Sequence, residues 1–160
     1  MSNELTTQVQ QPTLLQMRMD SKTYPRLCRY DHSEAVRRMS AIVSKAMLYR
    51  GQTADEMAIS VISSALVDEL LLEDKWGAKH LSFEEISIVV NKAVLESDIY
   101  VSVSSLYKVI IEFCKGEGSR IQKEAADLKR RQEDESLKKS VIAPMLQAYT
   151  GAFLKNNKIK

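Results

Sequence analysis

Residues 53–116 decide the fold of this chain, and they read TADEMAISVISSALVDELLLEDKWGAKHLSFEEISIVVNKAVLESDIYVSVSSLYKVIIEFCKG. The opening Thr53-Ala-Asp-Glu56 has the form of a capping box, in which the first and fourth side chains bond each other's backbone amides at a helix start. Apolar residues then recur at three- and four-residue steps, which predicts one buried helix face. That predicted face comprises Met57, Val61, Ile62, Ala65, Leu66 and Leu70. Gly77 is placed to stop this helix in the left-handed conformation.

Ser82-Phe83-Glu84-Glu85 repeats the capping pattern and predicts a second helix whose first residue is Phe83. Its expected buried stripe is Ile86, Val89, Val90, Ala93 and Val94. A third helix should start near Ser102 or Ser104 and end at Gly116 and Gly118. It is expected to bury Leu106, Val109, Ile110 and Phe113. Two capping boxes in one chain favour an all-α fold.

The flanking segments complete the predicted architecture. We expect residues 1–24 to form a flexible arm, because their first dozen are polar and rich in glutamine. A helix should run from a cap at Ser33 to about Tyr49 and stop at Gly51. Residues 119–140 read as a charged, exposed helix, and Ser140 could cap a short final helix with Pro144 in its first turn.

The sequence therefore predicts an all-α protein: a compact bundle of about five to six helices with a disordered N-terminal arm and a charged C-terminal helix. The expected parts are the arm (1–24), a helical core (25–118), and a C-terminal part (119–160) that packs on the core or on a partner.

Composition limits the cellular setting. No apolar run approaches the roughly 18–20 residues that cross a bilayer, and residues 1–30 lack the apolar centre of a secretory signal. The two cysteines, Cys28 and Cys114, are far apart and in no motif. We therefore expect a cytoplasmic protein without a membrane partner.

Charge is segregated along the chain, although the formal net charge is only +2. Residues 1–50 hold eight Lys/Arg against four Asp/Glu, residues 51–100 three against ten, and residues 101–160 twelve against seven. The basic ends could contact nucleic acid. The alternative, which we favour, is that they neighbour the acidic middle in the fold or in an oligomer, since mixed charge is normal on surfaces.

Basic and aromatic residues alternate over residues 24–38, a pattern that can hold phosphates and stack on bases. A second basic run precedes three acidic residues in the charged helix. The candidate nucleic-acid-binding residues are Arg26, Arg29, Arg37, Arg38, Lys129, Arg130 and Arg131. The alternative is that the arginines line the outer face of a helix and the tyrosines pack on it.

Patterns for catalysis or metal binding are not found. His32 and His80 are the only histidines, and Cys28 with His32 lacks the further ligands that zinc requires. Gly116-Glu117-Gly118 is not a phosphate loop, because it has no Gly-Lys-Ser/Thr. We expect no catalytic residues, metal, cofactor or small-molecule substrate, and hence no enzyme.

The order of segments resembles a known group of proteins. Pro12-Thr13-Leu14-Leu15, Gln52-Thr53-Ala54-Asp55-Glu56 and His80-Leu81-Ser82-Phe83-Glu84-Glu85-Ile86 open successive helices, and a helix rich in Lys, Arg and Glu follows Phe113. This looks like small, largely uncharacterised helical proteins of phages and mobile elements of gut bacteria, for which a replication-accessory role is suspected. The resemblance covers about residues 12–130. It departs from the group at residues 96–104, where Glu96-Ser97-Asp98-Ile99-Tyr100 replaces a turn like Gly-Arg-Tyr-Gly.

Two functions are expected from these observations. The first is a non-enzymatic phage or mobile-element protein, accessory to DNA replication through contacts with DNA or replisome proteins. The second is a structural or assembly protein, either a helical homo-oligomer or a component of a virion-like particle. A protein partner or self-association is expected in both.

Overall fold

The computed structural model describes residues 12–156, with side chains described to residue 145 except at positions 141 and 143. Within this range the fold is all-α, as predicted, and the only extended pairing is an isolated antiparallel bridge between Arg26 and Ser82. The chain divides after Gln122 into two units, which are described separately.

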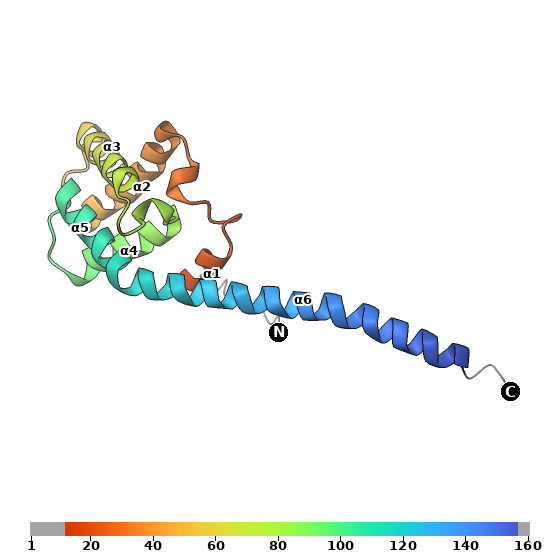
Figure 1. Ribbon diagram of the computed structural model, residues 1–160. Coiled ribbons are helices and arrows are strands. Elements are labelled where there is room, and N and C mark those ends of the chain that lie inside the picture. The colour runs from red at the N-terminus through yellow and green to blue at the C-terminus, as the bar shows by residue number, and fades with distance from the viewer. Residues whose placement is uncertain (1–11, 157–160) are drawn as a thin grey trace, which may run out of the picture. The chain divides into compact units, whose positions relative to one another are not determined.

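Four long helices make up most of the first unit (Figure 1). They are α2 (His32–Tyr49), α3 (Glu56–Leu72), α4 (Phe83–Glu96) and α5 (Val103–Phe113). α2 packs against α3 and α4, and α5 packs against the same two helices from the other side. The short α1 (Leu14–Met19) contacts α4, and the 3-10 turns η1 (Leu27–Arg29) and η2 (Ala78–His80) contact each other. Fully buried core side chains include Leu27, Met39, Val43, Leu66, Val67, Leu70, Leu81, Ile86, Val90, Leu106 and Ile110.

Two predicted helix starts are confirmed and two predicted caps were wrong. Ser102 caps α5, as the prediction of a start near Ser102 or Ser104 had it. Ser82 caps α4 in a complete capping box, with its hydroxyl accepting from the Glu85 amide at 3.2 Å and the Glu85 carboxylate accepting from the Ser82 amide at 2.8 Å. The predictions of Ser33 and Thr53 as caps were wrong. Asp31 caps α2 and Asp55 caps α3. An aspartate accepts the orphan amides equally well and adds a negative charge at the positive end of the helix.

Of the helix ends predicted at glycines, one is confirmed and another was wrong. Gly51 has a φ of 64° and follows the end of α2, as predicted. The prediction that Gly116 and Gly118 end α5 was wrong, because the chain continues through a π-helical turn, η3 (Cys114–Gly118), into α6. At Gly118 a Cβ would lie 3.0 Å from the carbonyl oxygen of Phe113, so the close backbone approach of this turn favours glycine.

The long α6 (Ser119–Asn156) contains Pro144 in its interior, so the prediction of a new helix capped by Ser140 was wrong. The Ser140 hydroxyl instead donates to the carbonyl of Leu137 at 2.8 Å. The proline removes one backbone donor from the helix ladder without ending the helix. At the other end of the chain, residues 1–11 of the predicted arm lie outside the described residues. The following residues form α1, whose start has a capping box between Thr13 and Gln16.

Candidate functional site

Arg26, the first of the predicted nucleic-acid-binding residues, lies in a buried ionic cluster. Glu85 is fully buried and accepts from Arg26 Nη1 at 3.1 Å and from Arg18 Nε. Arg26 Nη2 donates to the carbonyl of Arg18 at 2.7 Å. Burial lowers the pKa of Arg26, which the charge of Glu85 partly offsets. The cluster of Arg18, Arg26 and Glu85, here called the buried ionic cluster, ties the segment before α2 to the start of α4.

Arg37 and Arg38 share one carboxylate on the same helix. Glu34 accepts from Arg37 Nε at 2.7 Å and from Arg38 Nε at 2.8 Å, and these two bonds lower the pKa of Glu34 to about 2. The Arg38 guanidinium also lies 4.6 Å from the ring centroid of Tyr30. This geometry matches the alternative in which arginines line a helix and a tyrosine packs on them.

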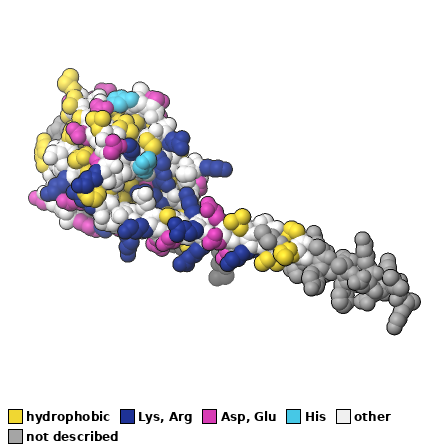
Figure 2. Space-filling view, in the orientation of Figure 1, with side chains coloured by type: hydrophobic (Ala, Val, Ile, Leu, Met, Phe, Trp, Pro, Cys, Tyr) yellow, Lys and Arg dark blue, Asp and Glu magenta, His cyan; other side chains and the backbone are white. Residues whose placement is uncertain are grey.

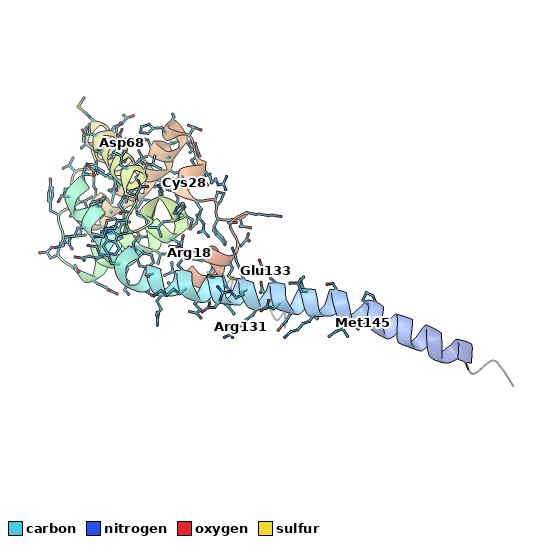
Figure 3. The ribbon with its side chains drawn as sticks, viewed as in Figure 1. Arg18, Cys28, Asp68, Arg131, Glu133 and Met145 are labelled. Carbon is cyan, nitrogen blue, oxygen red and sulfur yellow. The ribbon has the colours of Figure 1, made fainter. Side chains whose placement is uncertain are left out.

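The remaining candidates are exposed. Arg29 follows Cys28 in η1, and no carboxylate lies within ion-pair distance of it among the described residues. Lys129, Arg130 and Arg131 are exposed on α6, where Glu133 follows closely (Figure 3). Within the first unit the structure brings together only Arg37 and Arg38, and both are paired.

A groove of about 660 Å³ lies between α2 and α4. Its lining includes Arg37, Arg38 and Lys45 on α2, with Phe83 and Ile42 at its base. Two acceptor oxygens in its lining residues, Glu84 Oε2 and Asn91 Oδ1, are buried and bond nothing in the described residues. Pro12, the first described residue, is also part of its lining.

The clearest departure from the predicted packing is on α3. Met57 and Val61 were predicted to be buried with Leu66 and Leu70, but their side chains are 75% and 62% exposed. At 3.6 residues per turn, Met57 lies about 180° and Val61 about 140° around the helix from Leu66. The core side of α3 is instead Ser63, Leu66, Val67 and Leu70. Because α3 carries apolar residues on nearly all sides, the residues chosen at three- and four-residue steps did not all lie on one face of the helix.

The residues that follow Met57 and Val61 on α3 line a second groove, of about 620 Å³. Its wall on α3 consists of Ala58 and Ile62, the chain neighbours of those two residues, and the wall opposite consists of residues 100–104. Tyr100 lines this groove and is 74% exposed. Leu48, 66% exposed, follows Met47 of the groove lining. We call this groove together with Leu48, Met57, Val61 and Tyr100 the apolar end. Figure 2 shows that hydrophobic side chains are exposed among the charged ones on the surface.

Hydrogen bonds from side chains to backbone groups connect the two sides of this groove. The Gln52 side chain accepts from the Val101 amide at 2.7 Å and donates to the Val101 carbonyl at 3.4 Å. Arg50 Nε donates to the Ile99 carbonyl at 3.1 Å and also forms an ion pair with Asp98. These contacts join the α2–α3 turn to the α4–α5 connection, so the groove is a preformed feature of the fold. Preformed apolar concavities with a few polar groups are typical of binding sites.

The histidines and cysteines form pairs rather than clusters. Cys28 Sγ lies 3.8 Å from His80 Nδ1, and His32 Nε2 lies 2.8 Å from Asp68 Oδ1. Burial raises the pKa of the Cys114 thiol to about 11. Over the described residues, no three His, Cys, Asp or Glu side chains are grouped to hold a metal ion. No described helix is both long and apolar enough to cross a membrane.

Comparisons with protein-family models, with curated proteins and with solved structures find no match for this chain. The functional argument therefore depends on the residues themselves. Of the two regions where the packing departs from a simple apolar core, the apolar end has exposed side chains that could bind, whereas the buried ionic cluster is internally satisfied. The sequence did not lead to a prediction of the apolar end, although one signal was present. The α3 segment has apolar residues on more sides than can pack against the core.

Proposed function

We propose that this protein is a non-enzymatic helical binding protein that acts through protein contacts at the apolar end. The single observation that supports this is a groove whose lining includes the exposed Tyr100 and, on α3, the residues that follow the exposed Met57 and Val61. Contiguous exposed apolar surface is a feature of protein interaction sites, because leaving it in water is unfavourable. Covering one such aliphatic side chain stabilises a complex by about 1.5–3 kcal/mol.

The proposed setting is an accessory role in the DNA replication of a phage or mobile element, for which the support is the resemblance in segment order. Protein contacts are favoured over DNA contacts within the first unit. Three of its four candidate arginines, Arg26, Arg37 and Arg38, already bond carboxylates. A phosphate would have to displace those partners.

Two measurements test this proposal. Binding to single- and double-stranded DNA is titrated from about 50 mM salt upward, and we expect no affinity that falls steeply with salt. Tagged protein is then used to capture proteins from the native host, with Val61→Lys compared against Leu72→Lys. Leu72 is equally apolar and 79% exposed on the same helix, about 16 Å along α3 from Val61. Loss of captured protein only with Val61→Lys supports the proposal. Equal capture by both variants, or strong salt-dependent DNA binding lost on replacing Lys129, Arg130 and Arg131, contradicts it.

A structural or assembly role is the second candidate, and exposed apolar side chains on α6 favour it. Leu137, Ile142 and Met145 are 60%, 51% and 66% exposed. A helix that carries such side chains over this length has a surface suited to pairing with another chain.

A further inference from the structure

We propose that the partner of the apolar end is a second copy of this chain, whose C-terminal stretch of α6 lies in the groove beside α3. This inference rests on the proposed function, because it names the partner of the same site. It joins two exposed apolar surfaces, one in each unit, across two molecules.

The stretch of α6 that would bind has the pattern of a groove-binding helix. Its described apolar side chains Leu137, Ile142 and Met145 are exposed, and Met145 is labelled on α6 in Figure 3. In the sequence, apolar residues continue at four-residue steps from position 137 through positions 141, 145, 149 and 153. Amphipathic helices bind grooves through anchors at this spacing.

Charge favours the C-terminal stretch of α6, rather than the α3 of a second copy, as the segment that binds beside α3. Residues 53–74 contain six Asp/Glu and no Lys or Arg, whereas residues 136–160 contain five Lys and no Asp or Glu. Asp55 and Glu56 are exposed immediately before Met57, and Lys138 and Lys139 are exposed immediately after Leu137. Two α3 faces brought together would place like charges opposite each other, while α3 and the end of α6 are of opposite sign. The same complementarity accounts for the basic and acidic segments of the sequence.

The geometry of the groove suits a helix. It is open along α3 between Ala58 and Ile62, and it is bounded opposite by the backbone of residues 100–104. Small residues line much of it: Ala58, Ser102 and Ser104 allow a helix to approach closely. Among the larger exposed side chains, Tyr100 lines the groove, and Met57 and Val61 precede Ala58 and Ile62 of its lining. Covering them would exclude water from the contact.

The test uses the full chain and two substitutions at exposed positions, with Leu72→Lys as the matched control. The two are Val61→Lys, next to Ile62 of the groove lining, and Met145→Lys on α6. Molar mass is measured by light scattering over a concentration series, and folding of each variant by circular dichroism. We expect the unsubstituted chain to associate. Each of Val61→Lys and Met145→Lys should weaken association about tenfold or more, and Leu72→Lys should leave it unchanged.

Mixing the two defective variants identifies the occupant. A Val61→Lys chain retains an intact α6 and a Met145→Lys chain retains an intact groove, so the mixture should form a heterodimer that neither variant forms alone. Failure of the mixture to associate, or weakening by Met145→Lys alone, would indicate α6 paired with α6 and overturn the inference. Weakening by Val61→Lys alone would indicate groove against groove and also overturn it, as would equal weakening by Leu72→Lys.

The inference and the proposed function fail in different ways. A chain that stays monomeric at high micromolar concentration, but whose capture of another protein is lost with Val61→Lys, refutes the second-copy partner and keeps the binding role. A Val61→Lys chain that matches the unsubstituted chain in both self-association and capture refutes both.

Discussion

The two ends of α4 contrast in what they bury. At its start, the charged side chains of Arg18, Arg26 and Glu85 are largely buried. Beyond its end, Tyr100 is largely exposed, as are Met57 and Val61 of α3. The inner charges have all found partners within the chain. The outer apolar side chains have none among the described residues of their own unit. Buried charged side chains that are paired within the chain therefore indicate a structural role, whereas exposed apolar side chains indicate a binding role.

The largest expected effect comes from the charged end. Replacing Glu85 by Gln keeps the hydrogen bond to the Ser82 amide but removes the one carboxylate of the described residues that pairs with Arg18 and Arg26. Leaving a buried ion without its partner costs about 3–5 kcal/mol in the free energy of unfolding. Urea denaturation measures this loss, with the exposed Glu56→Gln as control. A loss below 1 kcal/mol would mean that the cluster is solvated, and the contrast between the two ends would disappear.

The next effect separates the cap from the ion cluster at the same end. Ser82→Ala removes the hydroxyl that accepts from the Glu85 amide at 3.2 Å and leaves the carboxylate contacts in place. We expect the free energy of unfolding to fall by about 1 kcal/mol, within the range for helix N-caps. The same urea titration checks this, and the double variant with Glu85→Gln should show coupling between the two residues. Strict additivity would indicate that Ser82 and Glu85 act independently.

At the apolar end the expected effect on stability is close to zero. Met57→Lys and Val61→Lys replace exposed side chains, so each should change the free energy of unfolding of the isolated chain by at most about 0.5 kcal/mol. Denaturation is measured at a concentration below that at which the chain associates. Leu66→Ala on the opposite side of α3 serves as the contrasting control, because Leu66 is fully buried and its truncation should cost about 2–5 kcal/mol. A comparable loss from Val61→Lys would show that this face is covered within the chain.

The smallest expected effect concerns Arg37 and Arg38, the two arginines of α2 that bond Glu34. The Arg37 and Arg38 hydrogen bonds lower the pKa of Glu34 to about 2 from an ordinary value of 4.5. Because the folded-state value is the lower one, the contribution of this carboxylate to stability is complete above about pH 4.5 and is lost as pH falls towards 2. Nuclear magnetic resonance titration of the Glu34 carboxyl carbon measures it, with Arg37→Gln and Arg38→Gln each expected to raise the pKa. High salt should shift it the same way, since Arg37 is well exposed. An ordinary pKa of Glu34 in the unsubstituted chain would mean that Arg37 and Arg38 are not held by this carboxylate. Both would then remain candidates for phosphate binding.

How far the sequence could predict the site depended on the range of the interactions involved. Ser82 and Glu85 were identified as a cap because their bonds are local, three residues apart. That Glu85 also holds Arg18 and Arg26, 67 and 59 residues away, has no local signal. Arg26 was accordingly placed among phosphate-binding candidates, whereas its guanidinium is already bonded to a carboxylate.

The apolar end was hidden for a related reason. Residue spacing on α3 identifies a helix but cannot choose which of several apolar faces meets the core. The same limitation applied to Gly118, where the signal for a helix stop was overridden by a π-helical turn that packs glycine against Phe113. The caps predicted at Ser33 and Thr53 were also wrong, because the spacing did not indicate that Asp31 and Asp55 take this role.

By itself, then, the sequence determined that this chain is all-α, where α4 and α5 start, where α2 stops, and that its charges are divided between acidic and basic segments. Periodicity, caps and composition are properties of neighbouring residues, so they are present before folding. The tertiary structure alone decided which face of α3 is buried, which arginines are already paired, and which apolar side chains remain exposed. Each of these depends on contacts between residues far apart in the chain, which exist only once the helices have packed.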